Sequence, residues 1–175
     1  MMTPTSPHES AGEYVEAAVA QHQASLLRYA ARLVGDLDRA RDVVQDTFVK
    51  FMAQPRDAVA GHEAEWLFTV CRHRAFDVLR KEGRMSRFEE GQAERVRSAE
   101  PRPGVELEQH ETQSALLALI DTLPPNQQEV IRLKFQSGFS YKEISRITAL
   151  SVSNVGFLIH TAVARLRRDF AALPR

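Results

Sequence analysis

Residues 140–168 read SYKEISRITALSVSNVGFLIHTAVARLRR, and their pattern predicts two helices joined by a tight turn. Ser140, with Glu143 three residues later, has the spacing of a capping box at the start of the first helix. Gly138 is suited to ending the helix before it. The second helix is long and amphipathic, which is typical of a helix-turn-helix. An ordinary helical hairpin is the alternative interpretation.

A helical wheel divides the second helix into two faces. The apolar face, which we expect to pack, holds Val155, Leu158, Ile159, Ala162, Val163 and Leu166. The other face, which is left for a partner, holds Ser153, Asn154, Gly156, Phe157, His160 and Thr161. In a helix-turn-helix the first turns of the second helix meet base edges in the major groove, so this second face would read DNA.

Length and composition suit a cytoplasmic protein of one or two small domains. The chain has 175 residues, and no window approaches the ~18 apolar residues of a membrane span, so we expect no membrane insertion. Residues 1–12 lack the basic start and apolar run of a secretory signal, and we expect them to form a disordered tail. Cys71, the single cysteine, has no internal partner for a disulfide, which fits a reducing compartment.

Charge is balanced overall but unevenly distributed. The 23 basic and 23 acidic residues give a formal net charge of zero, which by itself argues against a nucleic-acid-binding protein. However, residues 72–87 carry six basic and two acidic side chains, and residues 126–175 carry eight and three. Residues 98–125, between them, carry one basic and five acidic side chains. Two basic segments separated by an acidic one favour a nucleic-acid partner.

Apolar periodicity predicts helices over residues 13–34, 38–52 and 63–82, with a loop over residues 53–62. In the second helix the apolar stripe is Val43, Val44, Thr47, Phe48 and Phe51. Its opposite face carries Arg41, Asp42, Gln45, Asp46 and Lys50. Taken alone, a polar face of this kind is simply solvated.

The third predicted helix combines cations with aromatic rings. One face holds Leu67, Cys71, Ala75, Val78 and Leu79, and the other Arg72, His73, Arg74, Arg80, Lys81 and Arg84, with Trp66 and Phe76 on this basic side. Bases stack on aromatic rings at ~1–3 kcal/mol each while cations hold phosphates, so single-stranded nucleic acid suits this face. Alternatively, both rings pack against neighbouring helices. Asp77 is expected to pair with Arg74, Arg80 or Lys81 rather than to act as a catalytic acid.

The remaining segments complete an all-α prediction. Residues 88–113 contain few large apolar residues and are predicted to be a flexible linker. Helices are predicted over residues 114–123 and 126–137, with Pro125 suited to a first turn. Strand-like alternation, a glycine-rich phosphate loop and metal-ligand spacing are all absent from the sequence. The expected fold is therefore two small helical domains joined by a linker, without a cofactor.

Three strings occur in a specific order: LLRYAARLVGDLDRARDVVQDTFVKFM, then EWLFTVCRHRAFDVLRKEGR, then LPPNQQEVIRLKFQSGFSYKEISRITALSVSNVGFLIHTAVARLR. In these strings the sequence resembles the extracytoplasmic-function (ECF) sigma factors of the sigma-70 family, over about residues 22–84 and 114–170. The resemblance implies sigma region 2 over residues 13–87 and sigma region 4, with its helix-turn-helix, over residues 114–175. It also implies a protein that is not an enzyme, because catalysis belongs to the polymerase.

The resemblance implies roles for three sets of residues. Docking on core RNA polymerase, in place of simple solvation, would use Asp42, Gln45, Asp46 and Phe48. Melting and holding the minus-ten promoter element would use Trp66, Arg72, His73, Arg74, Phe76, Arg80, Lys81 and Arg84. Binding of the minus-thirty-five element would use Ser151, Ser153, Asn154, Phe157, His160, Thr161, Arg165 and Arg168. An anti-sigma factor is a further implied partner.

The sequence departs from the usual family pattern at several positions. Arg41 stands where an acidic residue is usual, and His73 stands where asparagine is usual. Ala149 replaces the glycine of the turn, which costs about 1 kcal/mol if its backbone is left-handed. Gly156, Leu158 and Thr161 occupy positions at which the family typically has lysine or arginine.

Two other functions are compatible with parts of the pattern. The uncharged face of the last helix suits a sigma-like decoy that binds an anti-sigma factor or polymerase without reading DNA. A stand-alone helix-turn-helix repressor leaves the basic and aromatic segment, residues 66–84, unexplained. The leading interpretation is a sigma factor that binds core RNA polymerase and directs promoter-specific initiation.

Overall fold

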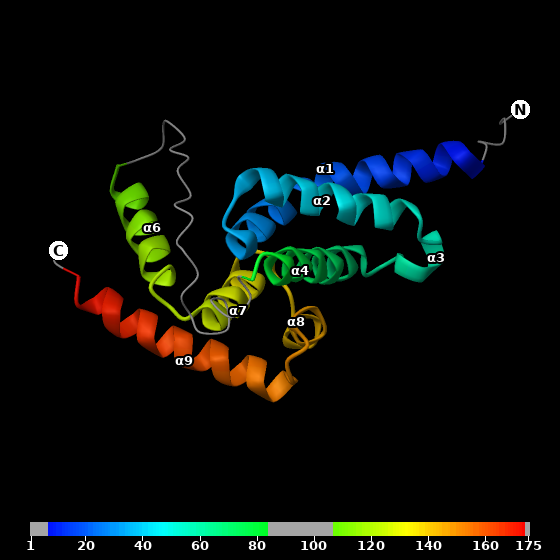
Figure 1. The fold of residues 1–175 in the computed structure, drawn as a ribbon. Coiled ribbons are helices and arrows are strands. Elements are labelled where there is room, and N and C mark those ends of the chain that lie inside the picture. The colour runs from blue at the N-terminus through cyan, green and yellow to red at the C-terminus, as the bar shows by residue number, and fades with distance from the viewer. Residues whose placement is uncertain (1–6, 84–106, 174–175) are drawn as a thin grey trace, which may run out of the picture. The chain divides into compact units, whose positions relative to one another are not determined.

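The computed structural model describes residues 7–83 and 107–173, and every regular element within these ranges is a helix (Figure 1). The all-α prediction is confirmed over the described residues. The chain divides into two compact units, residues 1–85 and 86–175. Each unit has its own buried core.

The first unit consists of three long helices and one short one. Helices α1 (Pro7–Val34), α2 (Leu37–Met52) and α4 (Glu63–Lys81) all pack against one another, and α3 (Arg56–Val59) lies between α2 and α4 in the chain (Figure 1). The largest side chains with almost no exposure in this unit are Leu26, Val34, Thr47, Val59, Leu67 and Cys71. Since these residues come from all four helices, the core is shared by the whole unit.

Two features of the first unit differ from the predictions. Helix α1 begins at Pro7, so residues 7–12 are helical and do not belong to the predicted tail. Residues 1–6 of that tail lie outside the described residues. The predicted loop contains the single turn of α3, which follows Pro55 and buries Val59. One turn is too short to show helical periodicity in a sequence.

The second unit consists of α6 (Leu107–Ile120), α7 (Pro125–Phe135), α8 (Tyr141–Thr148) and α9 (Val152–Ala171), and α9 packs against the other three (Figure 1). Pro125 is the first residue of α7, as predicted. Helix α6 begins inside the segment predicted to be a linker, and the rest of that segment, residues 88–106, lies outside the described residues. The largest side chains with almost no exposure in the second unit are Val130, Leu133, Ile144, Ile147 and Val155.

The helix-turn-helix is formed by α8 and α9. The capping box is confirmed, because the backbone N–H of Glu143 donates to Ser140 Oγ at 3.3 Å and the backbone N–H of Ser140 donates to Glu143 Oε2 at 2.7 Å. Ala149 ends α8 in the left-handed conformation, with φ 60° and ψ 20°. Ser151 then caps α9 by accepting from the backbone N–H of Asn154 at 3.1 Å.

None of the described helices is by itself long and apolar enough to cross a membrane. Helices α8 and α9 meet that criterion of length and composition only as a pair, and they are bent by 105° at the turn between them. Both helices contribute to the core of the second unit, through residues such as Ile144 and Val155.

Candidate nucleic-acid and protein interfaces

Three of the four residues predicted to dock on polymerase lie exposed along α2: Asp42, Gln45 and Asp46. The prediction for Phe48 requires correction. Its side chain is only 8% exposed and belongs to the apolar stripe, together with Val44 and Phe51. A ring that is buried in the core of the free unit does not offer a docking contact.

Two exposed apolar side chains on α2 were not among the contacts predicted from the sequence. Val49 is 58% exposed and Met52 is 64% exposed. They follow Gln45 by four and seven residues, so they lie on the same side of the helix. Their position outside the apolar stripe was the signal that could have identified them. We call Asp42, Gln45, Asp46, Val49 and Met52 the docking face.

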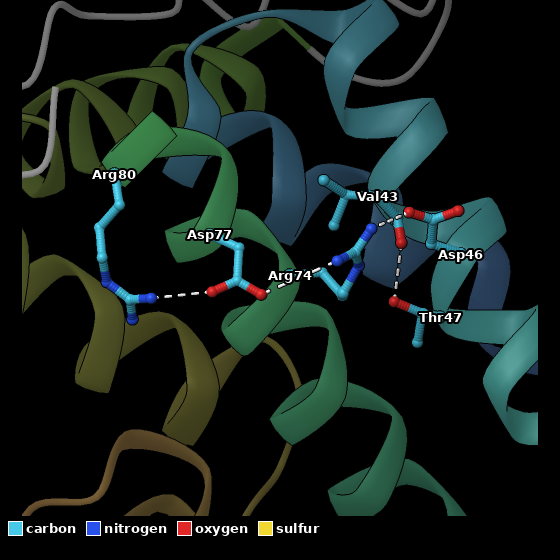
Figure 2. A network of polar contacts seen from close by, with 6 residues as sticks. All are labelled: Val43, Asp46, Thr47, Arg74, Asp77 and Arg80. Carbon is cyan, nitrogen blue, oxygen red and sulfur yellow. Dashed lines mark hydrogen bonds and ion pairs between the residues drawn. The ribbon is translucent and has the colours of Figure 1, made fainter. Parts of the chain in front are cut away.

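An ion-pair network joins α2 to α4 (Figure 2). The Arg74 guanidinium, on α4, pairs with the Asp46 carboxylate of the docking face, and its Nη1 lies 3.8 Å from Asp77 Oδ2. Arg80 Nη1 donates to Asp77 Oδ1 at 2.8 Å. The ion-pair prediction for Asp77 is thereby confirmed, with Arg74 and Arg80 as its partners. A residue predicted to contact polymerase is thus bound directly to one predicted to contact DNA.

On the basic side of α4, several cations are exposed but the Phe76 ring is buried. Phe76 is 6% exposed, and the Arg72 guanidinium carbon lies 4.1 Å from its ring centroid. The prediction that Phe76 stacks on a base therefore requires correction, and packing within the unit is the right interpretation. His73, Arg80 and Lys81 are exposed. Arg84 lies outside the described residues.

Trp66 is partly exposed and is held in a cluster of rings. Its centroid lies 5.7 Å from that of Phe51, which in turn lies 5.7 Å from that of Tyr14. The Tyr14 hydroxyl donates to Glu63 Oε1 at 2.9 Å, and the Arg56 guanidinium carbon lies 4.6 Å from the Tyr14 ring centroid. Helix α1 therefore supports both the start of α4 and the segment between α2 and α4. Arg56, an exposed cation beside this cluster, was not identified from the sequence.

The second unit offers a largely uncharged surface on α9. Ser151, Ser153, Asn154 and His160 are exposed, Thr161 is partly exposed, and Phe157 is 66% exposed. The opposite face is buried at Val155, Leu158, Ile159 and Ala162, as the helical wheel predicted, whereas Val163 and Leu166 on that face are partly exposed. We call Ser153, Asn154, Phe157, His160 and Thr161 the reading face. Its chemistry is that of hydrogen-bonding groups around one exposed aromatic ring.

The cations of α9 lie towards its C-terminal end. Arg168 is exposed and Arg165 is partly exposed. Both approach one carboxylate, since Asp169 accepts from Arg168 Nε at 3.0 Å and its other oxygen lies 3.5 Å from Arg165 Nε. This shared carboxylate offsets part of their positive charge in the free protein.

The single cysteine packs in the core of the first unit. Cys71 is fully buried, and burial raises the pKa of its thiol to about 12, although a hydrogen bond with Thr47 opposes that rise. The thiol is therefore protonated at neutral pH. Among the described residues, no group of three or more His, Cys, Asp or Glu side chains is arranged to hold a metal ion.

Comparison with known proteins agrees with this two-unit arrangement. The model of Sigma-70 region 2 matches residues 18–85, and that of Sigma-70 region 4 matches residues 113–166. The two matches define the class of protein, a sigma-70-type transcription initiation factor.

Individual relatives identify the family within that class. ECF RNA polymerase sigma factor EcfG from Rhodopseudomonas palustris is 31% identical over 81% of this chain and 77% of its own length. ECF RNA polymerase sigma factor SigL from Mycobacterium tuberculosis is 31% identical over 84% of this chain and 83% of its own length. The chain belongs to the ECF RNA polymerase sigma factors, and these matches do not favour the decoy alternative.

A solved structure gives the same fold. The sigma factor RpoE from Bartonella quintana, in complex with the anti-sigma factor NepR, matches with a TM-score of 0.63 and 26% sequence identity. The match covers 91% of this chain and 98% of that one. The resemblance noted in the sequence is therefore supported by family models, by relatives and by structure.

Proposed function

We propose that this sigma factor binds core RNA polymerase through the docking face of α2 and directs initiation through two DNA-binding surfaces, on α4 and on α9. The observation that carries the proposal is that α9 buries Val155, Leu158, Ile159 and Ala162 on one face and leaves Ser153, Asn154, Phe157 and His160 exposed on the other. The protein would act in the cytoplasm as a regulatory subunit that contacts promoter DNA. Catalysis would belong to the polymerase.

The docking face would bind core polymerase through both polar and apolar side chains. Asp42 and Gln45 offer exposed hydrogen-bonding groups, while Val49 and Met52 offer apolar area that becomes buried on binding. Burial of apolar surface contributes about 25 cal/mol per Å², whereas exposed charges contribute mainly specificity and association rate. Val49 and Met52 therefore supply affinity, and Asp42 and Gln45 supply orientation.

The minus-ten element is bound by the basic side of α4. His73, Arg80 and Lys81 are exposed, and Trp66 is partly exposed at the start of the same helix. A row of cations that ends in an aromatic ring suits a melted strand, because phosphates need positive charge and an unpaired base needs a ring to stack on. Of the two rings predicted on this side of α4, Trp66 supplies that contact, since Phe76 is buried.

The minus-thirty-five element is read by α9 in duplex form. Asn154 and Ser153 lie in the first turn, beyond the Ser151 cap, where a recognition helix meets base edges. Asparagine can pair with adenine in a bidentate manner, and an exposed aromatic ring such as Phe157 can contact a thymine methyl. Arg165 and Arg168 bind phosphates and so position the helix.

An anti-sigma factor is a further proposed partner. The support for it is that the solved sigma factor RpoE, which has the same fold, was determined in complex with the anti-sigma factor NepR. Such a partner would compete with polymerase or DNA for surfaces of the two units.

Transcription in vitro with purified core polymerase tests the proposed function. We expect the full chain to make core polymerase initiate at promoters recovered from polymerase-bound DNA after overexpression of this protein. Core polymerase without the chain is the control. Binding to core polymerase without any initiation at those promoters would contradict the proposal and favour a decoy.

A further inference from the structure

The start of α4 is held by a residue of α1. In the described part of the chain, helices α2, α8 and α9 each begin with a side-chain cap, whereas His62, at the start of α4, makes no such hydrogen bond. A helix start without a cap leaves backbone N–H groups unsatisfied and is less stable. The first residue of α4 is instead tied to α1, because the Tyr14 hydroxyl donates to Glu63 Oε1 at 2.9 Å.

Both groups are in the right ionisation state for this bond at neutral pH. Partial burial, and then the hydrogen bond to Glu63, raise the pKa of the Tyr14 phenol above its ordinary value of 10, so the hydroxyl remains a donor. Partial burial opposes ionisation of Glu63, but hydrogen bonds from its own backbone, from the backbone of Gly61 and from Tyr14 hold the pKa of its carboxyl below 4.5. The carboxylate therefore joins α1 to the first turn of α4.

Tyr14 also contacts the segment between α2 and α4 at other points. Its ring stacks on that of Phe51, near the end of α2, with centroids 5.7 Å apart. The guanidinium carbon of Arg56, in α3, lies 4.6 Å from the Tyr14 ring centroid. One side chain of α1 thus fixes the end of α2, the turn of α3 and the start of α4.

Two routes lead from Tyr14 to Trp66. Glu63 precedes Trp66 by three residues, so the two lie on neighbouring turns of one side of α4. Phe51, which is only 2% exposed, lies between the other two rings, since its centroid is 5.7 Å from that of Trp66 as well. Trp66 itself is partly exposed. Its ring is therefore held from below by Phe51 and along the backbone by Glu63, while part of its surface stays accessible.

We propose that Tyr14 is a positioning residue for the minus-ten element, which orders the Trp66 ring before an unpaired base stacks on it. The inference rests on the proposed role of Trp66 and adds a residue of α1 that acts through it. A ring that is already ordered in the free protein loses less freedom on binding, so the same contact gives a higher affinity. Tyr14 supplies that order without touching DNA.

Fluorescence of the full chain tests whether Tyr14 orders the ring, because Trp66 is the only tryptophan in the sequence. Tyr14→Phe removes the hydroxyl and keeps the ring that packs on Phe51. We expect acrylamide to quench the tryptophan faster in this variant and the fluorescence anisotropy to fall. Tyr29→Phe makes the same change on the same helix, ~22 Å further along, and should match the wild type. Wild-type quenching and anisotropy in Tyr14→Phe would overturn the proposal.

Binding of the holoenzyme to a single strand that carries the minus-ten element tests the consequence for DNA. For Tyr14→Phe we expect affinity to fall about two- to tenfold, which is the worth of one hydrogen bond. Its affinity for core polymerase should stay that of the wild type, which also shows that the variant is folded. Tyr29→Phe should bind the strand as the wild type does. Wild-type affinity of Tyr14→Phe for the strand would overturn the proposal.

A double-mutant cycle separates positioning from a general effect on the unit. In a Trp66→Leu background, Tyr14→Phe should cause no further loss of affinity for the strand, because the hydroxyl acts through the missing ring. Additive losses would overturn the proposal. If Trp66→Leu alone bound the strand like the wild type, the proposed role of Trp66 would have failed instead. The fluorescence measurement needs no DNA, so it distinguishes that failure from a failure of Tyr14 to order the ring.

Discussion

At the scale of single residues, Ala149 holds the least favourable backbone conformation in the described chain. It is the one non-glycine residue there with a positive φ. The left-handed conformation costs an L-residue about 1–2 kcal/mol, and glycine loses about 0.4–1 kcal/mol through its freer unfolded chain. We therefore expect Ala149→Gly to raise the free energy of unfolding by roughly 0.5–1 kcal/mol, as measured by urea denaturation.

Ala164 provides the matched control. It is exposed in the interior of α9, where glycine should lower the free energy of unfolding by about 1 kcal/mol. If Ala149→Gly and Ala164→Gly destabilised the protein equally, the conformation of Ala149 would not be a source of strain.

The stability of the helix-turn-helix depends on the ionisation of the Glu143 carboxyl group. Hydrogen bonds from the backbone and side chain of Ser140 hold the pKa of the Glu143 carboxyl below its ordinary value of 4.5. Its contribution to stability is therefore complete above pH 4.5 and is lost as the pH falls through the lowered folded-state pKa. We expect Glu143→Gln to reduce the loss of thermal stability in this acid range. A curve of unfolding temperature against pH identical to that of the wild type would contradict this.

At the scale of elements, the roles that we propose along α9 separate base reading from phosphate binding. Asn154 lies in its first turn, and Arg168 lies near its end. We expect Asn154→Ala to lose about 1–3 kcal/mol of discrimination at one base pair of the upstream element. Arg168→Ala should instead weaken binding to all sequences about equally. Footprinting of the holoenzyme on promoters with single changes in that element measures both effects, and the reverse pattern would contradict the proposed roles.

Periodicity predicted the elements well because most of them are amphipathic. The apolar stripe of α2 and the two faces of α9 follow directly from the spacing of residues such as Val43 and Val155. The capping box at Ser140 and the left-handed Ala149 are local features, so they too could be predicted from sequence alone.

The errors arise where tertiary packing decides which residues are exposed. Helix α4 packs against both α1 and α2, so its buried arc is wider than one stripe and includes Phe76. A helical wheel does not show how many neighbours a helix has. The packing of Tyr141 shows the same limit, since its ring, on α8, lies 3.5 Å from the position of a Cβ atom on Gly156, on α9. That contact is long-range and leaves no periodic signal.

At the scale of the whole molecule, substitutions in the two units should cause different defects in transcription. We expect the double variant Asp42→Ala with Gln45→Ala to weaken binding to core polymerase by about tenfold, and to lower transcription from all promoters by a common factor. Its free energy of unfolding should change by no more than about 0.5 kcal/mol per substitution, because both side chains are exposed. Affinity for core polymerase measures docking, and transcription from promoters with different upstream elements is the comparison.

Promoter dependence in that double variant would contradict the division of labour. Asn154→Ala is the reference for such dependence, since its defect should vary with the upstream element. The two variants together distinguish a weaker polymerase contact from a weaker DNA contact.

The ion pair between Asp46 and Arg74 (Figure 2) has a consequence for the genetics of this protein. Loss of the Asp46 carboxylate removes a charge from the docking face and also leaves Arg74, on the side of α4 that we propose binds DNA, with Asp77 as its remaining partner in this network. One mutation then has two phenotypes, in docking and in promoter opening. Second-site suppressors of an Asp46 allele should accordingly arise at Arg74 as well as in the polymerase. A single side-chain contact would then couple the docking phenotype to the promoter-opening phenotype.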